Sequence, residues 1–188
     1  MAPDRPHLLG IDDGPVVRDA PDGVVVVGVV MEGADLVEGI AITRFPADGP
    51  DATEFLVNWV VGLRFRPALQ GLLLGGITIA GLGVIDVVEL ADRLELPVIA
   101  VNRRDPRNHQ LDRALRAAGL EDRLAVVDRT PEAVRPGTRV YLACAGIDPE
   151  GAARLLRQCT GKSDLPEPIR LAHLIARATT TGESRGRA

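Results

Sequence analysis

The stretch HLLGIDDGPVVRDAPDGVVVVGVVMEGADLVEGIAITRF, residues 7–45, decides the fold. It contains three apolar runs, at 7–12, 23–31 and 36–45, and polar, turn-forming segments separate them. Consecutive strands joined by short turns are typical of an antiparallel meander. We therefore predict that the chain opens with three antiparallel strands.

The pattern changes after this opening. The segment PADGPDAT at 46–53 combines proline, glycine and candidate N-cap residues, so we predict a helix from residue 54 to about 63. Beyond it, apolar runs that suit buried strands alternate with segments of helical period, and this predicts parallel strands joined by helical crossovers. The predicted strands cover 71–77, 96–102, 124–128 and 138–146, and the predicted helices cover 84–94, 111–118, 149–159 and 168–178.

A β-β-β-α-β-α-β order is typical of the ribonuclease H-like fold, and a split Rossmann-like sheet is the alternative. We predict an α/β protein in which an antiparallel three-strand meander continues into parallel strands with flanking helices. A length of 188 residues suits one domain. We assign it to 1–178 and treat 179–188 as a polar C-terminal tail.

Composition narrows the classes of function. A net charge of −4 argues against binding polyanions over the whole surface, yet arginines crowd residues 103–123, so a local basic face remains open. Aromatic residues make up only 3% of the chain, which makes a base-stacking surface hard to build. Neither a nucleophile elbow nor a zinc-ligand spacing occurs in the sequence.

Two features bear on cellular location. Residues 67–85 carry no charge, but their glycines and the following Asp86 favour a buried strand, turn and helix over a membrane span. Cys144 and Cys159 fall in a predicted strand and helix, without metal-ligand spacing, so we expect reduced thiols. With no signal-peptide pattern at the N-terminus, these features predict a cytoplasmic protein that does not enter a membrane.

Acidic residues end the first strand. Asp12 and Asp13 are adjacent, so their side chains point to opposite faces, and one of them is a candidate metal ligand while the other shapes the turn at Gly14. Asp51 and Glu54 flank the start of the next helix, where acids also serve as caps. Magnesium tolerates sites with one or two carboxylates. Asp12 with Asp51 or Glu54 is therefore a candidate magnesium site.

Two further features have both a structural and a functional interpretation. The glycines of GGITIAGLG at 75–83 invite a phosphate-binding loop before a helix, although the match to nucleotide-binding motifs is poor. Binding of a small phosphorylated ligand is therefore one functional hypothesis. His173 on the last predicted helix is interpreted as a core or cap histidine on its own evidence.

Six ordered blocks carry a family resemblance: LLGIDDG, GVVMEG, DGPDATE, GITIAGLGVIDV, LPEPIRLAHLIA and GESRGRA. At these residues the chain resembles the uncharacterised archaeal family of unknown function number ninety-nine, a distant relative of endonuclease V. The resemblance covers nearly the whole chain. It implies an endonuclease V-like form of the ribonuclease H-like sheet, and a magnesium- or manganese-dependent nuclease that acts on deaminated or structured nucleic acid.

The resemblance also implies roles for individual residues. Asp12 takes the place of the first-strand catalytic aspartate, Asp51 or Glu54 that of the catalytic glutamate, and His173 that of a C-terminal catalytic residue. Gly75 stands where endonuclease V has a second aspartate. Losing this acid matters because two-metal phosphoryl transfer shares carboxylates between both ions.

Arginines supply the remaining candidates. Arg103 or Arg104 falls near a lysine of endonuclease V, and Arg170 lies one helical turn before the C-terminal histidine. We predict that these three arginines contact DNA or RNA. If the glycine prevents catalysis, the alternative is a non-catalytic nucleic-acid- or nucleotide-binding module on the same fold.

Overall fold

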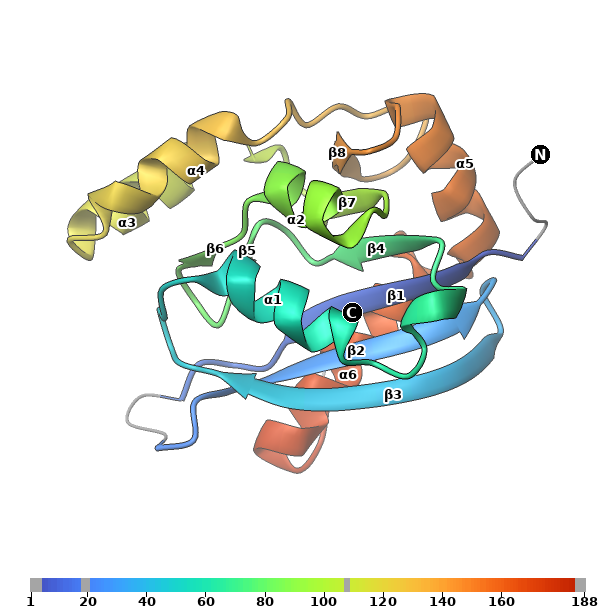
Figure 1. Ribbon diagram of the computed structural model, residues 1–188, viewed down its shortest axis with the longest axis horizontal. Coiled ribbons are helices and arrows are strands. Elements are labelled where there is room, and N and C mark those ends of the chain that lie inside the picture. Colours follow the sequence, from blue (N-terminus) through green and yellow to red (C-terminus); the bar gives the residue numbers. More distant parts are fainter. Residues whose placement is uncertain (1–4, 18–20, 107–108, 185–188) are drawn as a thin grey trace.

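Six strands form one mixed sheet in the order β3-β2-β1-β4-β7-β8 (Figure 1). The computed structural model describes residues 5–17, 21–106 and 109–184. A separate pair of short strands, β5 and β6, forms a hairpin beside the sheet. The strands are β1 His7–Asp13, β2 Val24–Glu32, β3 Leu36–Phe45, β4 Gly71–Leu74, β5 Thr78–Ile79, β6 Gly83–Val84, β7 Val98–Asn102 and β8 Tyr141–Ala145.

The predicted meander is confirmed. β2 pairs antiparallel with β1 and with β3, and each strand lies within a residue of its predicted bounds. A bulge in β3 opposite Val30 and Met31 skips Glu38. The valines of β2 alternate between two cores, because successive strand residues face opposite sides of the sheet.

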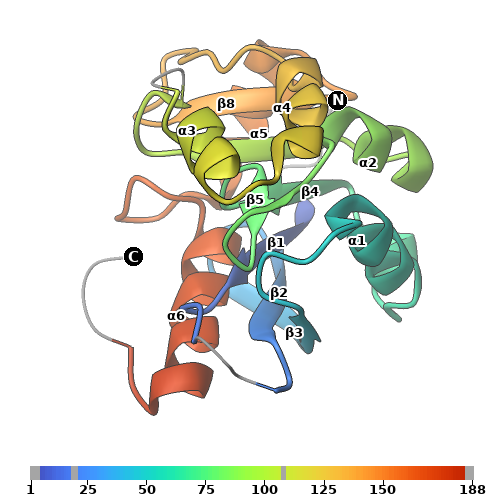
Figure 2. The ribbon, with the colours of Figure 1, turned by 90° about the vertical axis from the view of Figure 1, so that its left-hand side faces the viewer.

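Helices cover both faces of the sheet (Figure 2). α1 and α2 lie on one face, and α5 and α6 pack on the other, with α6 across β1 and β2. α3 and α4 extend beyond the end of β7 (Figure 1). The helices are α1 Ala52–Val61, α2 Val87–Leu94, α3 Gln110–Ala117, α4 Leu124–Arg129, α5 Pro149–Cys159 and α6 Glu167–Thr181.

The central strands are parallel, as predicted, but β8 is not. β1, β4 and β7 run in one direction, whereas β8 pairs antiparallel with β7, with Tyr141 opposite Asn102. After β7 the chain stays at the edge of the sheet where β7 ends, and it enters β8 from that same edge. A parallel strand would have required a crossover to the opposite edge.

The predicted strand at 124–128 is wrong, because these residues form helix α4. A short apolar run has no period that separates strand from helix. Residues 123–124, 126–127 and 130 are partly buried, whereas 125, 128 and 129 are exposed, and this spacing is helical. Two arginines also anchor the segment: Arg123 donates to the carbonyls of Leu82 and Asp48, and Arg129 donates to Asp86.

The glycine-rich stretch after β4 also differs from its prediction. β4 ends at Leu74, three residues early, because Gly75 and Gly76 break the strand and Gly76 has a φ of 115°. The β5–β6 hairpin occupies 78–84, and α2 begins at Val87 rather than at residue 84. Short hairpins of this kind leave little periodicity to detect.

The C-terminal helix is longer than predicted. α6 continues to Thr181 and ends at Gly182, whose φ of 82° is the left-handed conformation that favours glycine. It therefore takes in the first three residues of the predicted tail, whose last four, 185–188, lie outside the described residues. Within the described part of the chain, no helix has the length and apolar character needed to cross a bilayer.

Both cysteines lie where the sequence predicted, in β8 and α5, and neither forms a disulfide. Burial raises the pKa of Cys144 to about 11 and that of Cys159 to about 12. Because the thiolate is the reactive form, we expect Ellman's reagent at pH 8 to react about 100-fold more slowly with the native protein than with the protein in guanidinium. The Cys144→Ser variant isolates Cys159, and a rapidly reacting Cys159 in the folded state would contradict this expectation.

Candidate functional site

Asp12 and His173, which are 161 residues apart in the chain, meet where α6 crosses β1. The Asp12 Oδ2 atom lies 3.0 Å from His173 Nδ1. Gly10 allows this close crossing, because a Cβ at that position would lie 2.5 Å from the Ile169 nitrogen. The helix thus rests directly on the strand, and His173 reaches the carboxylate one turn further on.

The Asp12–His173 contact has an electrostatic consequence. Hydrogen bonding to the Asp12 carboxylate raises the pKa of His173, although partial burial opposes the effect. The side chain of Asp12 is 16% exposed and that of His173 is 38% exposed. The pair therefore favours an imidazolium beside a carboxylate, and a proton is held at the rim of the site.

Asp13 has a different role from its neighbour. As predicted for adjacent strand residues, the side chains of Asp13 and Asp12 point in different directions. Asp13 Oδ2 accepts a hydrogen bond of 2.9 Å from the Ala80 nitrogen in the β5–β6 hairpin. Burial raises the pKa of Asp13 to about 7, and the nearby Asp12 charge adds to the effect. Asp13 therefore holds the hairpin in place and does not share a ligand position with Asp12.

A cavity of about 220 Å³ opens beside Asp12 and His173. It lies at the carboxyl ends of β1, β4 and β7, the edge of the sheet where three parallel strands end. A larger cavity of about 730 Å³ adjoins it, and Gly75, Asn102 and Arg103 line both. The other residues of the smaller cavity are Val101, Leu165 and Ile169.

Sequence reasoning missed Asn102. It is the last residue of β7, so its amide reaches the same edge as Asp12. The sequence pattern that could have identified Asn102 is a polar residue directly after the apolar run LPVIAV, and the same pattern identified Asp12. The candidates drawn from the sequence were instead the next two residues, Arg103 and Arg104.

Gly75 lies against Asp12. β1 and β4 pair in parallel up to Ile11 and Leu74, so the next residue on each strand is Asp12 and Gly75. A Cβ at position 75 would lie 2.8 Å from Asp12 Oδ1. Any side chain at position 75 would therefore require the Asp12 carboxylate to shift.

Asp51 and Glu54 do not join Asp12. They border another cavity, of about 450 Å³, with Thr53 and Asp86. The hairpin separates the two places, because Ala80 binds Asp13 on one side and the Asp48 nitrogen on the other. In the described residues, His7, Glu32 and Glu38 form the one group of three potential ligands within 4.8 Å of one another, and it lies at the opposite edge.

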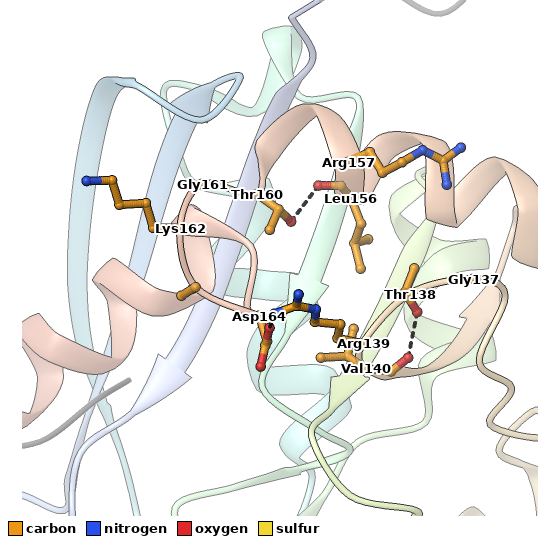
Figure 3. Close-up of a pocket in the computed structure, with 11 residues that line it drawn as sticks. Gly137, Thr138, Arg139, Val140, Leu156, Arg157, Thr160, Gly161, Lys162 and Asp164 are labelled. Carbon is orange, nitrogen blue, oxygen red and sulfur yellow. Dashed lines mark hydrogen bonds and ion pairs between the residues drawn. The ribbon is translucent and has the colours of Figure 1, made fainter.

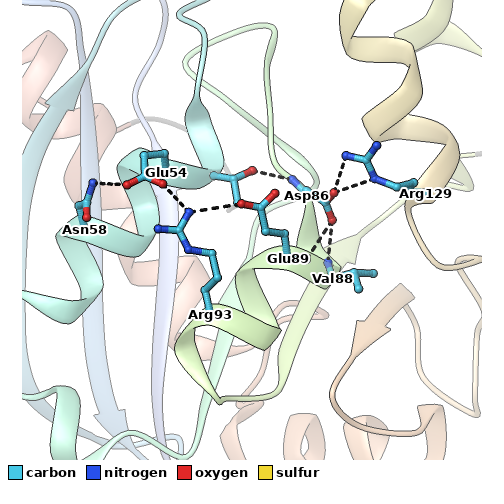
Figure 4. A network of polar contacts seen from close by, with 8 residues as sticks. Glu54, Asn58, Asp86, Val88, Glu89, Arg93 and Arg129 are labelled. Atoms are coloured by element: carbon cyan, nitrogen blue, oxygen red, sulfur yellow. Dashed lines mark hydrogen bonds and ion pairs between the residues drawn. The ribbon is translucent and has the colours of Figure 1, made fainter.

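Glu54 is engaged in a polar network between α1 and α2 (Figure 4). Its carboxylate accepts from Arg93 and, at 2.8 Å, from Asn58. The hydrogen bond from Arg93 holds the pKa of Glu54 below its ordinary value. Asp51 has a left-handed backbone conformation, with a φ of 57°, and precedes α1 without a side-chain capping bond. The structure thus places both acids at a helix junction.

The glycine-rich segment does not present a free helix N-terminus to a phosphate. Asp86 caps α2, and its Oδ1 accepts from the nitrogens of Val88 and Glu89 (Figure 4). Its Oδ2 accepts two hydrogen bonds from Arg129, at 3.0 and 2.8 Å. Burial acts to raise the pKa of Asp86, but these hydrogen bonds outweigh it and lower the pKa. The protein's own carboxylate thus takes the position that a phosphate would need.

The three predicted nucleic-acid-binding arginines lie in different surroundings. Arg103 lines both cavities, and Arg104 lines the larger one. Arg170 is partly buried and pairs with Glu167 on its own helix through two hydrogen bonds, at 2.8 and 2.6 Å. Of these three arginines, Arg103 is the one that lines the cavity beside Asp12.

Known proteins share this architecture. The family described as endonuclease dU matches residues 5–180. The UPF0215 protein of Methanothermobacter thermautotrophicus is 40% identical over 186 residues, 97% of this chain and 91% of that protein. A crystal structure of a protein of unknown function from Archaeoglobus fulgidus has a TM-score of 0.84 and 34% identity, with 93% of this chain and 98% of that chain covered.

The fold is also similar to that of endonuclease V. Endonuclease V of Ciona intestinalis, in a complex with a 24mer DNA containing an inosine followed by a ribo-adenosine, has a TM-score of 0.56 and 16% identity. The match covers 89% of this chain and 82% of that one. The endonuclease V-like mixed sheet that the sequence predicted is confirmed.

Proposed function

Because this chain belongs to the endonuclease dU family, we propose that it is a divalent-metal-dependent endonuclease that cleaves a phosphodiester bond near a deaminated base. The observation that carries this proposal is the meeting of Asp12 and His173 at the ends of three parallel strands. Arg103 and Asn102 line the same cavity. A carboxylate, an imidazole, an amide and a guanidinium together suit a metal ion and a phosphate group.

The donor set fits one divalent ion. Asp12 supplies a carboxylate and Asn102 an amide at the same cavity, whereas His173 in its protonated form has no lone pair to give the ion. Magnesium and manganese accept such sparse oxygen sets, because water and substrate phosphate complete the coordination. A two-ion site needs further shared carboxylates, and Gly75, Asp51 and Glu54 do not bring one into this cavity.

Each residue has a separate proposed role. A bound ion would polarise the phosphodiester and favour ionisation of a water molecule. Asp12 would hold the ion by its negative charge. As water attacks the phosphorus and releases its proton to solvent, the P–O bond breaks and the protonated His173 donates a proton to the departing oxygen. Arg103 offsets the charge of the phosphate. Asp51 and Glu54 have no part in this proposal, because their cavity is a different one.

Cleavage assays test the proposed function directly. The purified protein is incubated with Mn²⁺ or Mg²⁺ and oligonucleotides of one sequence that contain deoxyuridine, inosine or no altered base. We expect strand cleavage beside a deaminated base and none after chelation with EDTA. Intact oligonucleotides under every metal condition would refute the proposal.

One observation favours a second candidate function. The cavity contains a single carboxylate, that of Asp12, which already bonds with His173. The alternative is therefore a non-catalytic module that holds nucleic acid with the same cavity. It predicts salt-dependent binding without cleavage, since phosphate contacts release counterions.

Introducing an acid at position 75 is not expected to create a two-ion site. In the Gly75→Asp variant the new Cβ would lie 2.8 Å from Asp12 Oδ1, so Asp12 must move. We expect cleavage to fall at least about tenfold, because a displacement of a catalytic group by about 1 Å can cost that much or more. Gly75→Ala is the matched control, because it adds the same Cβ without a charge, and a similar loss is expected. A Gly75→Asp protein more active than wild type would contradict this geometry.

A further inference from the structure

A second cavity lies at the same edge of the sheet, beside the segment that leads into β8 (Figure 3). Its volume is about 320 Å³. Three segments line it: residues 137–140, which lead into β8; Leu156 and Arg157 near the end of α5; and the turn 160–164 between α5 and α6. None of these residues belongs to the site around Asp12.

Topology places the two cavities next to each other. Because β8 is antiparallel to β7, the residues that precede Tyr141 lie at the edge where Asn102 ends its strand. α5 follows β8 and returns the chain to that edge. Leu165 borders the Asp12 cavity, and its neighbour Asp164 borders the second one. A bound strand that leaves one cavity along this edge meets the other.

The second cavity is basic in a protein whose net charge is −4. Three cations line it, Arg139, Arg157 and Lys162, against one acid, Asp164. Arg139 Nη1 lies 3.0 Å from Asp164 Oδ1 at an exposed site, so this pair is weak and little stability is lost when it opens. Within the described part of the chain, Arg157 and Lys162 have no ion-pair partner.

The cations are spread along the cavity. Figure 3 shows Lys162 and Arg157 on opposite sides of the cavity, with their charged ends directed outward and away from each other, and Arg139 and Asp164 between them. A single small anion would need converging donors, whereas successive phosphates of a chain need separated ones. The arrangement therefore suits an extended polyanion.

The hydroxyl groups of the cavity hold its walls. Thr138 donates to the Val140 carbonyl at 2.7 Å, Thr160 to that of Leu156 at 2.6 Å and Ser163 to that of Leu165 at 2.8 Å. These bonds fix the loops that present the cations. The three cations remain the groups available to a ligand.

From this arrangement the structure assigns to Arg139, Arg157 and Lys162 a second contact with the sugar-phosphate backbone of the strand that occupies the Asp12 cavity. This assignment rests on the proposed function, and it adds the direction in which the substrate strand leaves the site. A strand long enough to span both cavities reaches these cations, and a shorter one does not. For single-stranded nucleic acid, removing one cation that neutralises a phosphate lowers the slope of log affinity against log salt by about 0.7.

Binding measured in EDTA tests the assignment without cleavage. Fluorescence anisotropy follows single-stranded 24-mer and 6-mer oligonucleotides with wild type and with the Arg157→Gln/Lys162→Gln variant. For the 24-mer we expect a loss of affinity of about 10- to 30-fold at 0.1 M salt and a salt slope lower by about 1.4, and for the 6-mer a much smaller loss.

Two controls separate charge at this cavity from charge in general. Arg5→Gln/Arg64→Gln removes two exposed arginines at the opposite edge of the sheet and is expected to bind like wild type. Arg157→Lys/Lys162→Arg keeps both charges and is expected to keep the affinity. Circular dichroism melting verifies that each variant is folded.

The outcomes distinguish this assignment from the proposed function. An unchanged 24-mer affinity in Arg157→Gln/Lys162→Gln, an equal loss in Arg5→Gln/Arg64→Gln, or no binding by wild type would overturn the assignment. Cleavage is scored separately in the metal assay. A protein that binds as expected without cleaving would retain this second backbone-binding role but not the proposed nuclease activity.

Discussion

The Asp12→Asn variant is expected to lose at least about 100-fold in metal-dependent cleavage. Loss of residues that merely orient metal ligands already costs about 10- to 100-fold, and Asp12 supplies the carboxylate itself. Asparagine keeps the shape of the side chain and still accepts the hydrogen bond from His173. The hydrogen bond to a carboxylate and the charge of that carboxylate both raise the pKa of His173, and a neutral amide provides a weaker hydrogen bond and no charge, so NMR titration should show that pKa lowered. Cleavage rates and the titration are measured on the same preparation.

Glu54→Gln is the matched control for this variant. It also replaces a carboxylate by an amide, but in the cavity between α1 and α2, and the ion pair with Arg93 that it removes is exposed. We expect activity within about twofold of wild type and little change in stability, because exposed ion pairs contribute little. Equal losses in Asp12→Asn and Glu54→Gln would show that both acids serve one metal site, against the geometry described above.

Gly10→Ala is expected to lower both the stability and the activity of the protein. The added methyl would lie 2.5 Å from the Ile169 nitrogen, within backbone that has no flexible side chain to turn aside. α6 must then retreat by about 1 Å to reach ordinary contact distance. We expect the free energy of unfolding to fall by about 3 kcal/mol and the melting temperature by roughly 6–12 °C. Urea denaturation and thermal melting measure these changes.

The catalytic loss in Gly10→Ala follows from the same displacement. Helix α6 carries His173, so its retreat lengthens the 3.0 Å contact with Asp12. Gly62→Ala is the control, because Gly62 has a helical φ of −75° and its added Cβ would lie 3.4 Å or more from its neighbours. That variant should be as stable and active as wild type. A Gly10→Ala protein with normal stability would show that α6 does not rest on β1 at this point.

Local sequence patterns predicted much of the fold. The first three strands were predicted almost to the residue, because an uninterrupted valine run between turn-forming segments has no helical alternative. The parallel core and the last two helices followed from the alternation of strand and helix periods. Asp12 was recognised from an acid at a strand end, and His173 entered through family resemblance.

Other elements depended on contacts distant in the chain. LAVVD at 124–128 resembles a strand, yet it forms α4. Arg123 anchors this segment to the hairpin through the Leu82 carbonyl, and Arg129 anchors it to Asp86. The direction of β8 depended on the edge at which the chain re-entered the sheet. Neither influence is encoded within the segment itself.

For the candidate site, the sequence by itself determined the residue types and the strand ends that carry them, because burial and period are properties of short segments. Only the tertiary structure decided which acids share a cavity. The hairpin around Ala80 separates Asp51 and Glu54 from Asp12, and Gly10 lets α6 bring His173 to it. Such encounters depend on the packing of segments far apart in the chain, and that packing is settled by the free energy of the whole fold.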